Sequence, residues 1–445
     1  MIKKSPNWRS SFTPDIFQKA LNSVELQEIV KRAEKEYVYW DKFRFYTPPK
    51  GFTVEEAWAY LKFSRSANQE NTLVKDEKGN RFVFTTTKTM FQKLSYVDSN
   101  TSGFLSSEWG KPTDAQKNQL IISGLSEEAI ASSQIEGANT SRKVAKEMLL
   151  SQRKPRNRSE QMILNNYRVM QKIVDFKDLE LNRDILLELQ KTITENAMDN
   201  PDDAGRFRKD VDNIQVVDPD TGLSVHIPPP ESIFHKELDR LIAFVNKDED
   251  GEDFIHPVVK ASVIHFWLAY LHPFVDGNGR TARALFYWYM LKKNYWVFQY
   301  LSISRVIKLT RTQYDNAFLK TELDDNDLTY FILYQIKAIN QSIDSFISHY
   351  KKKIEDNRKI ESISIKLKGF NTRQISLINY LYSHSDITVT IKWHQNKYQT
   401  AYQTARTDLI KLSESGFLSQ VTDGRKYVYI PNIPEITKII EPIKK

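Results

Sequence analysis

Two strongly helical runs, Val258 to Leu271 and Thr281 to Lys293, are separated by a short loop that contains Asp276-Gly-Asn-Gly-Arg280. The most apolar stretches within them, 263–271 and 284–291, are far shorter than the roughly 20 residues that cross a bilayer. We therefore predict two helices of a globular domain, joined by a tight loop, and no membrane span.

Helical spacing extends well beyond this pair. From 115 to about 350, apolar residues recur near a 3.6-residue period, as in Ser159 to Val174 and Arg183 to Ala197. The clear interruption is Gln215 to Ile227, in which two apolar strands flank a turn-rich centre and three prolines follow. The pattern predicts a mainly α fold with a β-hairpin inserted into the helical core.

The two ends of the sequence have different patterns. Before the core we expect mixed structure, with a helix from Phe17 to Tyr39, a helix from Thr53 to Ser64 capped by Thr53, and a β-like stretch from 80 to 86. After a charged stretch at 351–359, two short amphipathic helices at 371–383 and 400–413 precede a hairpin at 416–430. Helices followed by a small hairpin suggest a winged-helix module.

Composition limits the alternatives. The 445 residues are 40% apolar and 27% charged, which indicates a soluble, globular, multidomain chain. The chain has no cysteine, so disulfides, thiol catalysis and thiolate zinc sites are excluded. The N-terminus lacks the apolar run of a secretory signal, and we expect a cytoplasmic protein. The net charge of +8 is weak support for a nucleic-acid partner, because 64 basic and 56 acidic residues are largely interspersed.

The loop after residue 275 has the features of an anion site. Gly277 and Gly279 allow positive φ and close approach of a ligand, so that consecutive amides at the start of a helix converge on phosphate oxygens. Arg280 and Arg283 add fork-shaped donors from the first helical turn. An ordinary helix-joining turn needs neither arginine, so we interpret the loop as a phosphate-binding site.

Two further side chains point to chemistry at this loop. Asp276 is acidic in a cationic setting, which makes sense if Mg²⁺ lies between it and the phosphates. His272 comes just before the loop and can remove a proton from an attacking hydroxyl near neutral pH. Although a lone histidine is usually a core residue, this combination predicts phosphoryl-type transfer.

The run from His272 to Arg283 resembles the Fic family motif, His-x-Phe-x-Asp/Glu-Gly-Asn-Gly-Arg-x-x-Arg, at every fixed position. The resemblance implies a protein adenylyltransferase, which moves AMP from ATP to a protein Ser, Thr or Tyr hydroxyl. It also implies the site residues: His272 as base, Asp276 for Mg²⁺, Asn278 and the loop amides for the α-phosphate region, Arg280 and Arg283 for the β- and γ-phosphates, Phe274 as packing anchor, and Gly279 as favouring AMP transfer over kinase activity.

A second segment resembles the inhibitory motif of the same family, Ser/Thr-x-x-x-Glu-Gly/Asn. Here it reads Ser132-Ser-Gln-Ile-Glu136-Gly137, with Ser132 and Glu136 on one helix face. The resemblance implies that Glu136 takes Arg283 away from the γ-phosphate, so that the isolated enzyme is mostly off. A solvated carboxylate at a helix end is the alternative. Whether the same glutamate supports removal of AMP is left open.

The hairpin at 215–227 corresponds in position to the family's flap, whose edge pairs with an extended target segment. Val216, Val225 and His226 are the candidate contacts, although a purely structural edge strand is the alternative. His256 and His265 are left out of the site, because a packed helix position explains His265 better than a metal site does.

The resemblance completes the predicted architecture: a mainly α, Fic-type helical core with an inserted β-hairpin flap, a mixed N-terminal region and a C-terminal winged-helix (α+β) module. The predicted bounds are 1–114 for the N-terminal region, 115–350 for the core with an inhibitory helix near 126–137, 351–368 for a linker and 369–445 for the last module.

The winged-helix module supports a second hypothesis, a DNA-binding regulator in which the Fic unit is subordinate. Thr404, Arg406 and Lys411 would lie on its recognition helix, but such modules also form dimer or protein contacts. The sequence leaves open whether the chain forms a homodimer and whether it transfers AMP to itself.

Overall fold

The computed structural model describes residues 2–101, 114–217, 221–247, 251, 254–398, 400–423 and 426–440. The chain divides into two compact units, Met1–Phe346 and Ile347–Lys445. Helices dominate and the sheets are small, which confirms the predicted mainly α fold. Within the described ranges, none of the helices combines the length and the apolar character that a membrane crossing requires.

The first unit begins with a region of short helices and one two-stranded sheet. Its elements are α1 (Trp8–Ser11), α2 (Pro14–Asn22), α3 (Val24–Glu36), α4 (Trp40–Phe43), α5 (Val54–Ser66), β1 (Glu70–Lys75), β2 (Arg81–Phe84) and α6 (Lys88–Thr101). Strands β1 and β2 are antiparallel, with Glu70 opposite Phe84.

Helix caps explain the bounds of this region. Thr53 caps α5 as predicted, in a reciprocal pair of hydrogen bonds with Glu56. The single helix expected from Phe17 to Tyr39 is wrong, because it is two helices. Ser23 interrupts it with an extended backbone, and its side chain accepts a hydrogen bond from the amide of Leu26 at the start of α3.

The rest of the first unit is a helical bundle with one hairpin. Its α-helices and strands are α7 (Asp114–Ile135), α8 (Arg142–Ser151), α9 (Arg158–Asp175), α10 (Arg183–Thr194), β3 (Val216–Val217), β4 (Ser224–His226), α11 (Glu231–Asn246), α12 (Pro257–Leu271), α13 (Asn278–Lys292), α14 (Ile303–Leu309), α15 (Arg311–Leu323) and the first part of α16 (Thr329–Lys366), which continues past Phe346 into the second unit. The short 3₁₀ turns of the described ranges include η1 (Pro201–Asp203), η2 (Asp210–Asp212) and η4 (Trp296–Tyr300).

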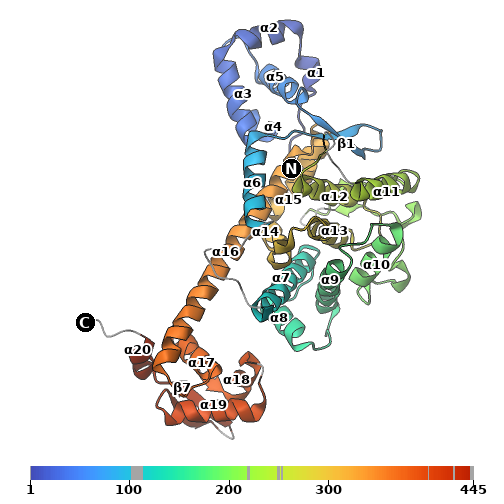
Figure 1. Ribbon diagram of the computed structural model, residues 1–445. Coiled ribbons are helices and arrows are strands. Elements are labelled where there is room, and N and C mark those ends of the chain that lie inside the picture. Colours follow the sequence, from blue (N-terminus) through green and yellow to red (C-terminus); the bar gives the residue numbers. More distant parts are fainter. Residues whose placement is uncertain are drawn as a thin grey trace. The chain divides into compact units, whose positions relative to one another are not determined.

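Helices α12 and α13 form the centre of this bundle, as Figure 1 shows. Nearly every residue of both helices is buried, including Trp267 and Trp288. Helix α13 also packs against α9, α10 and α7. Burying this pair supplies much of the hydrophobic driving force of the unit and fixes the loop between the two helices in a rigid frame.

The second unit combines short helices with a three-stranded sheet. Its elements after α16 are α17 (Thr372–Ser383), β5 (Val389–Thr390), α18 (Ile391–Tyr398), α19 (Tyr402–Glu414), β6 (Leu418–Asp423), β7 (Lys426–Pro431) and α20 (Ile433–Ile440). The strand order is β5-β7-β6. The sequence interpretation omitted β5 and α18. The stretch expected to be a linker, 351–368, is helical through Lys366.

Candidate active site

The loop that joins α12 to α13 turns within a few residues because two of them have positive φ. His272 ends α12 at φ +47°, and Gly277 precedes α13 at φ +85°. A Cβ on Gly277 would press against the side chains of Ile193 and Thr194. Helix α13 begins at Asn278, three residues before the predicted start, because this turn already directs the chain into the helix.

Asn278 braces the loop from inside. Its Oδ1 accepts a hydrogen bond from the amide of Phe274 at 2.9 Å, and its Nδ2 donates to the carbonyl of Phe274 at 2.8 Å. The Phe274 ring is buried and stacks on Phe207, with ring centroids 5.5 Å apart. The Asn278 side chain therefore holds the loop in shape, with both ends of its amide already bonded within the protein.

His272 is held in one tautomer. Its Nδ1 lies 3.3 Å from the carbonyl oxygen of Ala269, and because a carbonyl can only accept, Nδ1 carries the proton. The other ring nitrogen, Nε2, then has the free lone pair. Burial and the nearby charge of His226 lower the pKa of His272 to about 4. The imidazole is therefore a neutral base at neutral pH.

Asp276 and Arg280 are bonded to each other and to the neighbouring helix. Arg280 donates to Oδ1 of Asp276 at 3.1 Å and to the carbonyl of Ile193 at 3.2 Å. The Arg280 side chain is buried, and among the described residues its Nε has no hydrogen-bond partner. Asp276 is 41% exposed, and Gln190 donates to its backbone carbonyl at 3.0 Å.

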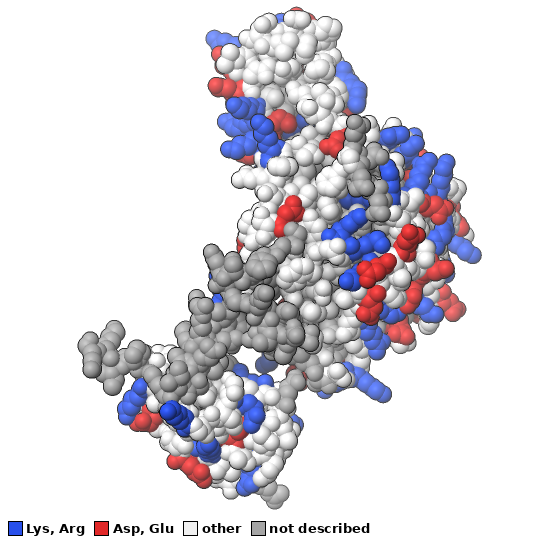
Figure 2. All heavy atoms as spheres, in the orientation of Figure 1, with Lys and Arg blue, Asp and Glu red and all other residues white. Residues whose placement is uncertain are grey.

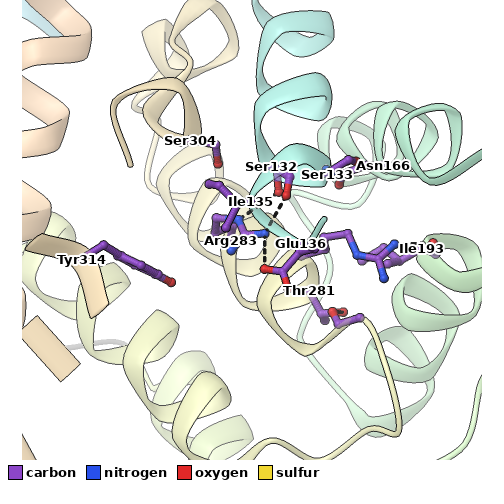
Figure 3. A network of polar contacts seen from close by, with 12 residues as sticks. Ser132, Ser133, Ile135, Glu136, Asn166, Ile193, Thr281, Arg283, Ser304 and Tyr314 are labelled. Atoms are coloured by element: carbon purple, nitrogen blue, oxygen red, sulfur yellow. Dashed lines mark hydrogen bonds and ion pairs between the residues drawn. The ribbon is translucent and has the colours of Figure 1, made fainter. Parts of the chain in front are cut away.

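Arg283, the last arginine of the motif, is held by α7. Its Nε donates to Oγ of Ser132 at 2.9 Å, and its Nη2 donates to the Ser132 carbonyl at 3.0 Å and to Oε1 of Glu136 at 2.9 Å. Figure 3 shows these three contacts converging on one guanidinium. Although burial opposes it, the charge of Arg283 lowers the pKa of Glu136, so this carboxyl is ionised.

Two glycines give Glu136 its position. Gly137, at φ +94°, lets the chain leave α7 directly after the glutamate. A Cβ on Gly279 would overlap with Oε1 of Glu136, so only a glycine leaves room for the carboxylate over the start of α13. The structure thus brings together Ser132, Glu136, Gly279 and Arg283, which the sequence places in two distant segments.

The hairpin lies where the sequence predicted it, with Val216 opposite His226. Val225 is 38% exposed, whereas Val216 is half-buried. The expectation that His226 contacts a target is not supported, because its side chain is only 12% exposed and both ring nitrogens face protein groups. Among the residues of the hairpin region that the structure describes, the exposed apolar ones are Val217, Leu223, Val225 and Ile227.

Sequence reasoning missed two side chains that hold the site together. Arg208 donates from Nε to the His272 carbonyl at 2.8 Å and from Nη2 to the carbonyls of Leu271 and Pro229. Gln190 accepts from the amide of Gly205 and donates to the loop at Asp276. Arg208 lies in the segment 205–209, which precedes the hairpin and resembles the family, although sequence reasoning assigned it no role. Nothing in the helical pattern distinguishes Gln190.

The two histidines left out of the site have structural contacts. His265 is buried, bonded to Tyr314 and Gln335, and burial lowers its pKa to about 3, which confirms a packed core position. His256 caps the start of α12 and bonds to Asp98. Among the described residues, no three His, Cys, Asp or Glu side chains cluster in a way that could hold a metal ion.

Comparison with known sequences finds similar proteins for the central part of the chain. Residues 180–290 match the sequence model of the Fic/DOC family. The protein adenylyltransferase Fic of Nematostella vectensis is 25% identical over 173 residues, which are 39% of this chain and 35% of that protein. The protein of the same name from Drosophila sechellia is 31% identical over 110 residues, 25% of this chain and 20% of that protein. The chain thus spans about a third or less of the length of these curated relatives.

Solved structures give distant likenesses. A fragment of Fic-1 from C. elegans, in a variant with one glutamate replaced by glycine, has 21% identity and a TM-score of 0.49, over 76% of this chain and 92% of that one. A Fic family protein from Desulfovibrio desulfuricans has 16% identity and a TM-score of 0.48, over 77% of this chain and 94% of that one.

Proposed function

Residues 180–290 place this chain in the Fic/DOC family, and from that premise we propose that it is a protein adenylyltransferase, which moves AMP from ATP to a Ser, Thr or Tyr hydroxyl of a protein. The observation that carries the proposal is the loop itself. A neutral histidine with a free Nε2 lies beside a glycine-containing helix start with two buried arginines.

In the proposed reaction, the target hydroxyl oxygen attacks the α-phosphorus of ATP. The bond between that phosphorus and the oxygen that bridges to the β-phosphate breaks, and pyrophosphate leaves. His272 accepts the hydroxyl proton at Nε2, since its Nδ1 is already protonated and bonded to Ala269. Arg208 fixes the histidine backbone for this step through the His272 carbonyl.

ATP would bind over the start of α13. The buried Nε of Arg280, which is without a partner among the described residues, fits a phosphate oxygen, and Arg283 would hold the γ-phosphate once it is released from α7. The role implied for Asn278 becomes indirect, because its amide shapes the loop amides instead of facing the nucleotide.

Mg²⁺ fits the loop through one carboxylate. Asp276 is partly exposed and its side-chain bonds to Arg280 and Gly277 both use Oδ1. Magnesium is commonly held by one or two carboxylates together with phosphates and water. When bound, the ion would neutralise phosphate charge, and Asp276 would orient it.

We further propose that Glu136 restrains the site. Its bond to Arg283 occupies the donor that the γ-phosphate needs. Charge-assisted hydrogen bonds contribute roughly 1.5–3 kcal/mol, which corresponds to about one to two powers of ten in occupancy. The resting enzyme would then be mostly off, with self-modification and a homodimer as compatible properties.

The test is labelling of proteins with radiolabelled ATP and Mg²⁺ by wild type, Glu136→Gly and His272→Ala. We expect Glu136→Gly to raise labelling by about ten-fold or more, and His272→Ala to abolish it in the Glu136→Gly background. Melting temperatures of all variants provide the folding control. If well-folded Glu136→Gly labels nothing above the His272→Ala variant, the adenylyltransferase proposal is wrong.

A second function, nucleic-acid binding by the second unit, is favoured by one observation. Residues 1–346 contain 47 basic and 47 acidic residues, whereas 347–445 contain 17 basic and 9 acidic residues. The whole excess of positive charge therefore belongs to the second unit. In the first unit, both signs are intermixed on the face that Figure 2 shows.

Of the residues proposed to read DNA, Arg406 fits best. It is exposed on α19, one helical turn after Tyr402, which is about half exposed. Thr404 is only half-exposed, and Lys411 donates to the carbonyl of Gly369 instead.

We expect the full chain to bind a fluorescent DNA duplex at about 50 mM salt and to lose that binding steeply by about 200 mM salt. Arg406→Ala should weaken it, whereas the matched control Lys438→Ala, on α20, should not. Absence of binding at low salt would contradict this second function and favour a protein contact.

A further inference from the structure

The second strand of the hairpin ends in a histidine whose side chain is only 12% exposed. His226 ends β4, and its ring lies between the C-terminal end of α12 and helix α15. The ring packs against Tyr270, with centroids 4.9 Å apart. The hairpin needs such an anchor, because β3 and β4 have only two and three residues and isolated hairpins are marginally stable.

Both neighbours of the His226 ring nitrogens are hydrogen-bond acceptors. Nε2 lies 2.8 Å from the carbonyl oxygen of Tyr270, and Nδ1 lies 3.0 Å from Oε2 of Glu322. A carbonyl and an ionised carboxylate cannot donate, and a neutral imidazole has only one N–H. Both contacts form together only when the ring carries two protons, which makes His226 a cation in this arrangement.

The charges around the ring agree with this protonation. Although burial alone would lower it, the bond and charge of Glu322 and the Tyr270 carbonyl raise the pKa of His226 above its ordinary value. The positive charge of Arg208 acts in the opposite direction and lowers the pKa of His226. The charge of His226 in turn lowers the pKa of His272. The backbone of Glu77 forms a hydrogen bond with the Tyr270 phenol.

We propose that doubly protonated His226 is a positioning residue, which fixes the hairpin to α12 and α15 and thereby sets where a target segment lies relative to His272. This inference rests on the proposed function, since it names the device that holds the target edge of the same site. His226 acts through the hairpin backbone and does not touch the reacting atoms.

The proposal gives the hairpin a pH dependence of definite sign. Because the pKa of His226 is raised in the folded protein, its anchoring is fully present below the unfolded value and is lost as pH rises through the folded value. Loss of the cation also removes one of the effects that keep the pKa of His272 low. Alkaline conditions should therefore loosen the hairpin before the rest of the unit unfolds.

The first test needs no catalytic activity. The full chain with ¹⁵N-labelled histidine is titrated by NMR, and the His226 signal is assigned by its loss in His226→Gln. We expect both His226 nitrogens to be protonated at neutral pH, and Glu322→Gln to lower its pKa by about one unit or more. His235, whose pKa is lowered by burial and by Arg183, is the internal reference and should be unaffected.

The second test measures order in the hairpin. Hydrogen exchange of peptides covering 214–230, corrected for the intrinsic pH effect, should be slow at about pH 6 and at least about ten-fold faster at about pH 9 in wild type. Glu322→Gln should be fast at both pH values, and the control Glu231→Gln should behave as wild type. A His226 signal with one proton at the lower pH, or exchange that ignores Glu322→Gln, would overturn the proposal.

These readouts separate two kinds of failure. If labelling with ATP fails but the titration and exchange behave as expected, the adenylyltransferase proposal is wrong and the anchor stands. If labelling succeeds in the Glu136→Gly variant, its pH profile gives a third readout. The apparent KM for added lysate protein should rise at alkaline pH, and His226→Gln should flatten this rise. A rise that persists unchanged in His226→Gln contradicts the anchor.

Discussion

Gly279 shows how one residue type links two functions. The motif places it in the predicted phosphate-binding loop. In the structure, the carboxylate of Glu136 occupies the space that a side chain at position 279 would need. The contact is with the end of a flexible side chain, so a methyl group at 279 can displace the glutamate without moving the backbone. The glycine therefore admits the proposed inhibitor to the site.

We predict that Gly279→Ala raises labelling above wild type, because it expels the Glu136 carboxylate and releases Arg283. The rise should be about ten-fold, within the effect expected for the lost hydrogen bond. Combining Gly279→Ala with Glu136→Gly tests whether the methyl group acts by displacing Glu136. If it does, the double variant should label no more than Glu136→Gly alone. If Gly279→Ala lowers labelling equally in the wild type and in Glu136→Gly, the methyl group instead obstructs nucleotide binding.

His272 supplies a pH prediction at the same scale. With a pKa lowered to about 4 by burial and by the charge of His226, the proposed base is neutral throughout the neutral range. Labelling by Glu136→Gly should stay constant as pH falls from about 7 to about 5.5, and decline as pH approaches the folded pKa. Initial rates in a buffer series measure this. A midpoint near about 6.5, the ordinary histidine value, would mean that His272 is not held as described.

At the scale of elements, α7 and α13 contact each other through polar residues one helical turn apart. Glu128 and Ser132 on α7 and Glu136 directly after its last residue follow each other at intervals of four, and Arg283 and Tyr287 do so on α13. Buried Glu128 accepts hydrogen bonds from Tyr287 and from the amide and hydroxyl of Ser304. Glu128 thus attaches the helix that presents Glu136 to both α13 and α14.

We predict that Glu128→Gln loosens this attachment. A glutamine is uncharged and can accept at one atom only, so the charge-assisted hydrogen bonds to the buried carboxylate are weakened, at a cost of about 1–3 kcal/mol. Labelling should rise, because Glu136 is then held less firmly. Glu127→Gln is the matched control, since Glu127 pairs instead with the exposed side chains of Arg142 and Lys146. If Glu128→Gln lowers Tm but leaves labelling unchanged, the attachment stabilises the fold without affecting Glu136.

At the scale of the whole molecule, the N-terminal helices belong to the same compact unit as α12 and α13. Lys62 of α5 forms a buried ion pair at 2.9 Å with Asp324, which also accepts from Tyr330 and Ser5. Tyr37 donates to Asp327 nearby. These carboxylates lie in the turn between α15 and α16, so the N-terminal region completes the burial of that turn.

We expect Lys62→Met to lower the unfolding free energy by roughly 3–5 kcal/mol, because it leaves Asp324 as an uncompensated buried charge. Lys19→Met, which removes an exposed ion pair with Asp15, should change stability by less than about 1 kcal/mol. Urea unfolding followed by tryptophan fluorescence measures both. If Lys62→Met lowers the unfolding free energy as little as Lys19→Met does, the buried ion pair is not needed to hold the N-terminal helices against the turn between α15 and α16.

Local sequence patterns were enough to predict the helical core, the loop and the position of the hairpin. Apolar periodicity is a local property, and the motif residues from His272 to Arg283 lie within one turn and one helix. Caps such as Thr53 are equally local, which is why the start of α5 was predictable. The capping signal of Ser23 was also present, but the longer helical pattern concealed it.

The contacts of several of these residues could not be predicted, because they depend on how distant segments fold together. The amide of Asn278 turned inward to Phe274, and the ring of His226 turned away from the hairpin surface toward Glu322. Arg208 and Gln190 reached the loop from other segments. Such choices depend on which donors and acceptors folding brings together from distant positions, and no local period records them.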